Sequence, residues 1–182
     1  CRLDRDDDME ITGKRHEALV EYEFGVDGEG RILGADIRHF IRCGYSCDLS
    51  GAIADRAMFH ADNAYDLKAA RIHSRRLKTH TVSNTAFRGF GGPQGMVAIE
   101  RAMDRIAFDL GLDPLDVRKR NFYAPMGAGE PGLTPYRMAV DDCVIAEIVD
   151  ELEVSSDYRA RREAVRAFNA ANYKVFAKEG AE

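Results

Sequence analysis

The chain has 182 residues, 26 of them basic and 31 acidic, and a formal net charge of −5. This length suffices for one domain with a hydrophobic core, whereas the acidic balance disfavours a nucleic-acid partner. No apolar run approaches the roughly 20 residues that a membrane helix needs, so we expect no membrane partner. No signal peptide is visible, which favours a cytoplasmic protein. The chain begins at Cys1 rather than methionine, and we expect it to be a segment of a longer polypeptide.

The N-terminal part is predicted to form a β-hairpin. Residues 2–5 are expected to end a strand, and the three aspartates at 6–8 to form a solvated turn. Apolar residues then alternate with polar ones over residues 18–26, which predicts a half-buried strand. Residues 27–30 read Asp-Gly-Glu-Gly, a typical hairpin turn, and residues 31–42 alternate again as a returning antiparallel strand.

A short helix is predicted after the hairpin. Ser50 is a good N-cap, and apolar residues follow it at helical spacing. Arg56 lies in the middle of this helix, where an arginine is ordinarily a surface residue paired with a nearby carboxylate. Residues 68–82 mix β-branched and charged residues and are predicted to be an extended, solvated segment. Cys43 and Cys47 have no second pair and are predicted to be free thiols rather than metal ligands.

The most specific local pattern is the run Phe87-Arg88-Gly89-Phe90-Gly91-Gly92-Pro93-Gln94-Gly95. Glycine adopts backbone angles barred to other residues and allows the main chain to approach a neighbour closely. Proline is favoured at the first helical position, and apolar spacing predicts a helix over residues 93–110 that Gly111 ends. A bare loop before a helix N-terminus suits an anionic group. A tight, closely packed start of a helix explains the same glycines.

The C-terminal third is predicted to be mostly helical. Residues 113–121 begin with Asp-Pro, the pair typical of an N-cap and first helical residue. Residues 126–135 are rich in glycine and proline and are expected to form a surface loop. Amphipathic spacing predicts a helix over residues 139–153, and a last helix is predicted from residue 157 to about residue 172.

Three stretches together resemble one family. The run Ser83-Asn84-Thr85-Ala86-Phe87-Arg88-Gly89-Phe90-Gly91-Gly92-Pro93-Gln94-Gly95 resembles the molybdenum-cofactor loop of the xanthine dehydrogenases, which are molybdenum hydroxylases. Residues 55–65, DRAMFHADNAY, are similar to the family's segment with a substrate-contacting arginine. Residues 113–123, DPLDVRKRNFY, resemble the helix and exit that follow the loop. The resemblance extends from about residue 3 to residue 172.

This resemblance implies a fold and a domain assignment. The expected fold is α+β: an antiparallel β-hairpin or sheet, followed by a glycine-rich loop and several helices. Residues 1–172 would be part of the molybdopterin-binding domain of a large subunit. Residues 173–182 depart from the family's sequence pattern, and we treat them as a separate tail that the resemblance does not assign to the domain.

The resemblance also implies residue roles. Arg56 would bind substrate and act in catalysis, since a planar guanidinium suits a heterocycle with carbonyl oxygens and stabilises negative charge that develops on it. Phe90 would pack against the substrate ring, although without the family it reads as a core aromatic. The implied cofactor-binding residues are Phe87, Arg88, Gly89, Gly91, Gly92 and Gln94, with the main chain of Arg88 near the molybdenum.

The implied function is part of the molybdenum-cofactor and substrate site of a xanthine dehydrogenase. That reaction is the oxidative hydroxylation of hypoxanthine and xanthine to urate, with electrons passed to 2Fe–2S clusters, FAD and NAD. Implied partners are a purine, the rest of the molybdenum subunit and the FAD and iron–sulfur domains, in an intact enzyme that is a homo-oligomer. No residue qualifies as the general base, so the segment alone is expected to be inactive.

Two alternatives remain open from the sequence. The first is an aldehyde oxidase or another molybdenum hydroxylase. Arg56 argues against an aldehyde oxidase, because members of that group generally lack an arginine at this place. The second is a non-catalytic binding or structural module with the same fold.

Overall fold

The computed structural model describes residues 1–124, 129 and 131–179, with only the backbone described for residues 173–179. The chain divides into two compact units, Cys1–Asp142 and Cys143–Glu182. Among the described residues, no helix combines the length and apolar character that crossing a membrane requires.

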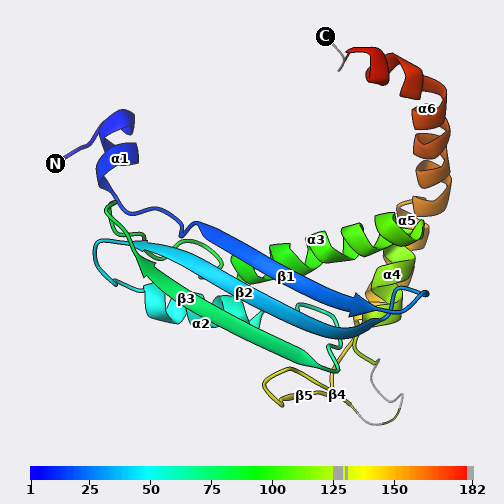
Figure 1. The fold of residues 1–182 in the computed structure, drawn as a ribbon, viewed down its shortest axis with the longest axis horizontal. Coiled ribbons are helices and arrows are strands. Elements are labelled where there is room, and N and C mark those ends of the chain that lie inside the picture. Colours follow the sequence, from blue (N-terminus) through cyan, green and yellow to red (C-terminus); the bar gives the residue numbers. More distant parts are fainter. Residues whose placement is uncertain (125–128, 130, 180–182) are drawn as a thin grey trace. The chain divides into compact units, whose positions relative to one another are not determined.

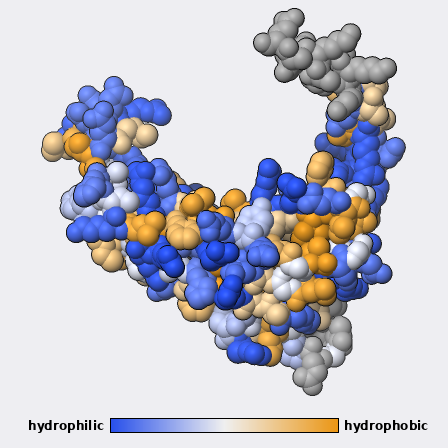
Figure 2. Space-filling model, in the orientation of Figure 1, coloured by the Kyte–Doolittle hydropathy of each residue, from blue (hydrophilic) through white to orange (hydrophobic). Residues whose placement is uncertain are grey.

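The first unit is built on a three-stranded sheet in the order β1-β2-β3 (Figure 1). β1 (Ala18–Val26) and β2 (Ile32–Gly44) pair antiparallel, which confirms the predicted hairpin. In the turn, the Asp27 carboxylate accepts hydrogen bonds from two main-chain N–H groups, and Gly30 adopts a φ of 83°. The outer face of the sheet is mostly hydrophilic with isolated hydrophobic spots (Figure 2).

The third strand lies within residues 68–82, which were predicted to be extended. The sequence did not predict the direction in which this strand pairs. β3 (Ala70–Lys78) pairs parallel to β2. Parallel neighbours need a long crossover, and α2 (Ser50–Phe59) lies in that connection. The sheet is therefore mixed, and α2 packs against its inner face with α3 beside it (Figure 1).

Two helices follow the glycine-rich loop, as predicted. α3 (Gly92–Leu110) ends at Gly111, whose φ is 66°. α4 (Pro114–Asn121) begins after Asp113, whose side chain accepts a hydrogen bond from the N–H of Leu115. Both predictions rest on local cap chemistry and are confirmed to within one residue at the helix starts.

The core lies between the inner face of the sheet and the helices. Ile37, Ile99 and Met103 are each 0% exposed. Asn121 connects α4 to the hairpin: its Oδ1 accepts from the N–H of Ile32 and its Nδ2 donates to the carbonyl of Gly30, both at 2.8 Å. These contacts fix α4 to the turn and to the start of β2.

Two predictions near helix starts are wrong. Residues 5–11 form α1 (Arg5–Ile11), capped by the Asp4 carboxylate, which accepts from the N–H of Asp7 at 2.9 Å. No strand ends at residues 2–5, and the aspartates occupy the first helical turn, where the helix dipole favours negative charge. Ser50 is not the N-cap of α2; that place belongs to Leu49, and the Ser50 hydroxyl lies 2.7 Å from His16 Nε2.

The C-terminal predictions hold only in part. Gly132–Leu133 (β4) pairs with Ala139–Val140 (β5), so the predicted helix starts later, as α5 (Ile145–Ser155). Part of the predicted loop, residues 126–128 and 130, lies outside the described residues. The last helix, α6 (Tyr158–Glu179), begins as predicted but continues past residue 172.

Candidate functional site

The loop before α3 is bent by three consecutive residues with positive φ. These angles are 93° at Gly89, 46° at Phe90 and 96° at Gly91. Phe90 N–H donates to the carbonyl of Phe87 at 2.8 Å, and Gly92 N–H donates to that of Gly89 at 2.9 Å. A phenylalanine in this region is uncommon, and such strained residues concentrate at ligand-binding sites.

Close packing between α2 and α3 accounts for two of the glycines. A Cβ atom on Gly91 would lie closer than 3.0 Å to the carbonyl oxygen of Ile53, a separation that real Cβ atoms do not show. A Cβ on Gly95 would collide in the same way with the carbonyl oxygen of Ala57. The bare backbone therefore lets the first turn of α3 touch the main chain of α2, and it holds the loop in place.

Arg15, from the segment before β1, secures the loop from the other side. Its guanidinium carbon lies 4.3 Å from the ring centroid of Phe87, and its Nη2 donates to the carbonyl of Arg88 at 2.8 Å. Phe87 remains 58% exposed. Arg15 has no signal in the local sequence, because its partners lie more than 70 positions away and its neighbours form no motif.

Three side-chain polar atoms beneath the loop are buried without a hydrogen-bond partner in the described part of the chain. They are Arg15 Nη1, His16 Nδ1 and Gln94 Oε1. The nitrogen of the Gln94 side-chain amide has a partner, because Nε2 donates a hydrogen bond to the carbonyl of His16 at 3.1 Å. Arg15 and Gln94 border the same small space as Phe87 and Phe90. Buried polar groups are normally paired, so these atoms are candidates for a partner outside the described residues, although the space between them is too small to admit a water-sized molecule.

The loop also presents main-chain donors. The hydrogen bonds between described residues include no acceptor for the N–H groups of Arg88, Gly89 or Gly91. These groups precede the N-terminus of a 19-residue helix, whose dipole favours negative charge at that end. The donor set of the loop thus suits an anionic ligand with several oxygen atoms.

Arg56 reaches this region from α2. The residue is exposed, and its Nε donates to His60 Nε2 at 3.3 Å. The His60 ring lies against Gly92, where an added Cβ would be 3.5 Å from Cδ2. The neighbouring Asp55 pairs with Arg76 instead. Among the described contacts, Arg56 is therefore linked to the start of α3 through His60, and no contact joins it to Phe90.

Cys43 is buried and Cys47 is exposed, and both are free thiols, as predicted. Within the described residues, no three His, Cys, Asp or Glu side chains gather as metal ligands.

We expect His16, which is packed under the loop, to make stability depend on pH. It is 2% exposed, and burial lowers its pKa below the usual 6.5, partly opposed by the charge of Asp48. The unfolded chain then binds a proton at a pH where the folded chain does not, so the free energy of unfolding should fall as pH drops below about 6.5. His39 is 1% exposed, and burial lowers its pKa as well. It should therefore also reduce the free energy of unfolding as the pH drops.

Urea unfolding at pH 7.5 and 5.5 measures this effect. The His16→Gln variant should lose less stability between the two values than the unmodified chain. His80→Gln, at an exposed position, serves as the control and should keep the original pH dependence. An unchanged pH dependence in His16→Gln would contradict the assignment.

Comparisons with known proteins agree on a family. Residues 1–122 match the model of a molybdopterin cofactor-binding domain. The chain is 43% identical over 172 residues to a xanthine dehydrogenase/oxidase of Mus musculus, covering 94% of this chain and 12% of that protein. It is 43% identical over 171 residues to xanthine dehydrogenase 1 of Arabidopsis thaliana, covering 93% and 12%.

A solved structure shows the same α+β fold. The aldehyde oxidoreductase from Desulfovibrio gigas superimposes with a TM-score of 0.77 and 28% identity, covering 91% of this chain and 18% of that one. The chain thus spans only 12% of the length of the two curated relatives named above.

Proposed function

Because this chain belongs to the family of molybdopterin cofactor-binding domains, we propose that its first unit forms one wall of the molybdenum-cofactor and substrate site of a xanthine dehydrogenase. The observation that carries the proposal is the loop before α3. Its N–H groups at Arg88, Gly89 and Gly91 have no acceptor among the described residues, and the neighbouring Arg15 Nη1 and Gln94 Oε1 have no partner there either. A segment that holds only one wall leaves the rest of the site to the larger polypeptide.

The residues present fit an anionic, hydrogen-bonding cofactor. The main chain of Arg88 and Gly89 and the guanidinium of Arg15 would donate hydrogen bonds to it, and the side-chain carbonyl oxygen of Gln94 would accept one. When bound, the molybdenum cofactor supplies the oxidation–reduction chemistry. Gly91 has a packing role beside its proposed contact with the cofactor: its bare backbone lets the start of α3 lie against α2. Gly92 lies next to His60 and remains a proposed cofactor-binding residue.

The proposed substrate is a purine such as hypoxanthine or xanthine. Arg56 uses Nε for His60 and forms no ion pair with any described residue, so its two Nη groups can donate to a purine carbonyl oxygen. Its charge would stabilise the negative charge that develops on the ring during oxidation. Phe90 would orient the planar ring by stacking or edge contact, worth about 0.5–1.5 kcal/mol beyond its buried area.

The proposal includes the surroundings of the site. The remaining walls, and the general base, would come from the rest of the molybdenum subunit. Electrons would leave through 2Fe–2S clusters to FAD and NAD in partner domains. The intact enzyme would be a cytoplasmic homo-oligomer, and residues 1–172 would belong to its molybdopterin-binding domain.

A second candidate is an aldehyde-oxidising molybdenum hydroxylase. It is favoured by the superposition on an aldehyde oxidoreductase at 28% identity. The two candidates differ in their demand for a charged donor at residue 56, because an apolar aldehyde offers one carbonyl oxygen whereas a purine offers several polar atoms. Arg56 therefore favours the purine.

The test uses the complete protein that contains these residues. Molybdenum per polypeptide would be measured by mass spectrometry, and turnover would be measured with hypoxanthine and with benzaldehyde. We expect about one molybdenum per subunit and faster turnover of hypoxanthine. Faster turnover of benzaldehyde would favour the second candidate, and a folded protein without molybdenum would refute both.

A further inference from the structure

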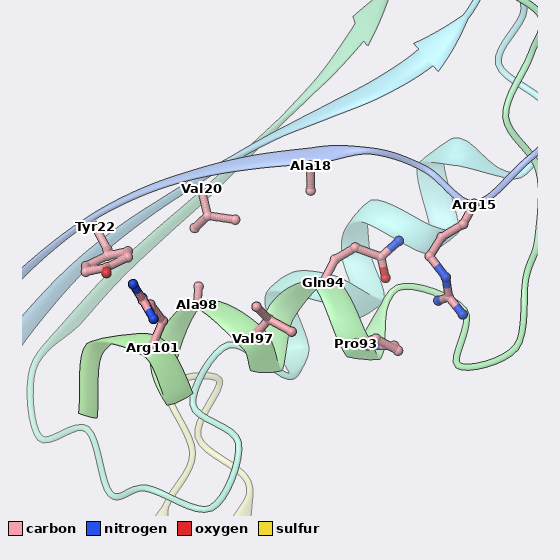
Figure 3. A pocket seen from close by; sticks show the side chains of 9 residues that line it. All are labelled: Arg15, Ala18, Val20, Tyr22, Pro93, Gln94, Val97, Ala98 and Arg101. Atoms are coloured by element: carbon pink, nitrogen blue, oxygen red, sulfur yellow. The ribbon is translucent and has the colours of Figure 1, made fainter. Parts of the chain in front are cut away.

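A groove separates the outer edge of β1 from α3. Ala18, Val20 and Tyr22 line it from the strand, and Val97 and Ala98 line it from the helix (Figure 3). Its volume is about 410 Å³. Val97 is 67% exposed although it faces this apolar surface. Arg101 lies at one end of the groove, and Arg15 and Gln94 lie at the end next to the candidate site (Figure 3).

The strand beside the groove has an unpaired edge. β1 is an outer strand of the sheet. Arg42 N–H donates to the carbonyl of Glu17 at 3.0 Å, which identifies the hydrogen-bonded pair of the antiparallel ladder. Because such pairs alternate, residues 19, 21 and 23 direct their main-chain groups toward β2. The main-chain groups of residues 18, 20 and 22 point away from the sheet.

The same three residues form the unpaired edge and line the groove. A strand that paired with Ala18, Val20 and Tyr22 would place the side chains of its paired residues on the same face, over α3. The groove is therefore where those side chains would lie. Its volume suits a few residues of about the size of valine, set at alternate positions of an extended segment.

The two edges of the sheet differ in how they are protected. β3, the opposite edge, carries Arg71, Arg75, Arg76 and Lys78. Charged residues of this kind discourage pairing with another strand. The groove-facing residues of β1 are uncharged, and the strand contains no proline. β1 also carries Glu21 and Glu23, which alternate with the groove-facing residues and do not line the groove. A long edge whose groove-facing residues are uncharged is a place where proteins accept another strand.

We propose that the outer edge of β1 binds an extended strand from the rest of the molybdenum-subunit polypeptide, with small apolar residues over α3 and a carboxylate beside Arg101. The larger polypeptide is the source because the chain spans only 12% of its curated relatives; this identification rests on the proposed function. We infer the carboxylate from the positive charge of Arg101, which forms no ion pair with any described residue. The bound strand would complete the sheet beside the cofactor loop.

Amide hydrogen exchange, resolved to single residues, tests the proposal. In the complete protein, the amides of Val20 and Tyr22 should exchange as slowly as those of Leu19 and Glu21. In the 182-residue chain alone, they should exchange at least about 100-fold faster, because opening an unpaired edge costs little. Equal, fast exchange of Val20 and Tyr22 in both proteins would overturn the proposal. Protection in the 182-residue chain that rises with concentration would overturn it in favour of a second copy.

A matched pair of variants on α3 locates the contact. Val97→Asp places a charge in the groove and should speed exchange at Val20 and Tyr22 in the complete protein at least about tenfold. Phe108→Asp changes an 81% exposed residue of the same helix that does not line the groove, and should have no such effect. Protection of Leu19 and Glu21 verifies that each variant is folded. An effect of both variants, or of neither, would contradict the proposal. Molybdenum content is measured separately, so strand pairing can hold even where the proposed cofactor function fails.

Discussion

Replacing Gly91 with valine should lower the free energy of unfolding by about 3–5 kcal/mol, combining the costs of overpacking and of a left-handed backbone angle. The reason lies in the contact between helices. The Gly91 backbone has a φ of 96°, and any Cβ there would overlap the carbonyl oxygen of Ile53. α3 would have to move away from α2, and the loop amides would move with it. Urea unfolding of the 182-residue chain measures the loss, and molybdenum content in the complete protein should fall in parallel.

Gly51→Ala is the matched control for this substitution. Gly51 lies in α2, the helix that Gly91 contacts, but a Cβ on Gly51 would meet no atom within 4 Å. Alanine should therefore be neutral or stabilising by up to about 1 kcal/mol. If Gly91→Val kept full stability but lost molybdenum, approach to the cofactor rather than helix packing would explain Gly91. Unchanged stability together with full molybdenum content would contradict both explanations.

Replacing Arg56 with methionine in the complete enzyme should reduce hypoxanthine turnover by about 10²–10³-fold, the usual cost of losing one donor that stabilises developing charge. Aldehyde turnover should change far less, because an aldehyde lacks the additional polar atoms of the purine. Arg56 is exposed and supports no described ion pair, so stability should stay within about 0.5 kcal/mol. Steady-state rates with both substrates, each normalised to molybdenum content, provide the measurement.

Arg75→Met is the control for charge removal at a distance from the site. Arg75 is an exposed residue of β3 that lies over the ring of Phe40. Its replacement should leave the ratio of purine to aldehyde turnover unchanged. Equal losses on both substrates in Arg56→Met would contradict the substrate role of Arg56 and favour a general effect on the site.

Local chemistry determined most of the elements. Alternation with period two predicted the hairpin, and Asp-Pro and Gly at helix ends predicted the bounds of α3 and α4. Each of these signals lies within a few residues of the strand or helix that it predicts, so a short segment of sequence is enough to recognise it. The errors also have local causes. The three aspartates after Asp4 suit a helix N-terminus as well as a solvated turn, and a short pair of strands occupies residues where amphipathic spacing favoured a helix.

The sequence by itself determined the α+β elements, the bent glycine loop and the chemical types of the candidate site residues. Only the tertiary structure decided which of those residues meet. It set β3 parallel to β2, turned the hydroxyl of Ser50 to His16, and brought Arg15 onto Phe87 and Arg88. It also explained Gly91 by its contact with Ile53. Each of these depends on packing between segments far apart in the chain, and such contacts leave no periodicity or cap signal in the local sequence.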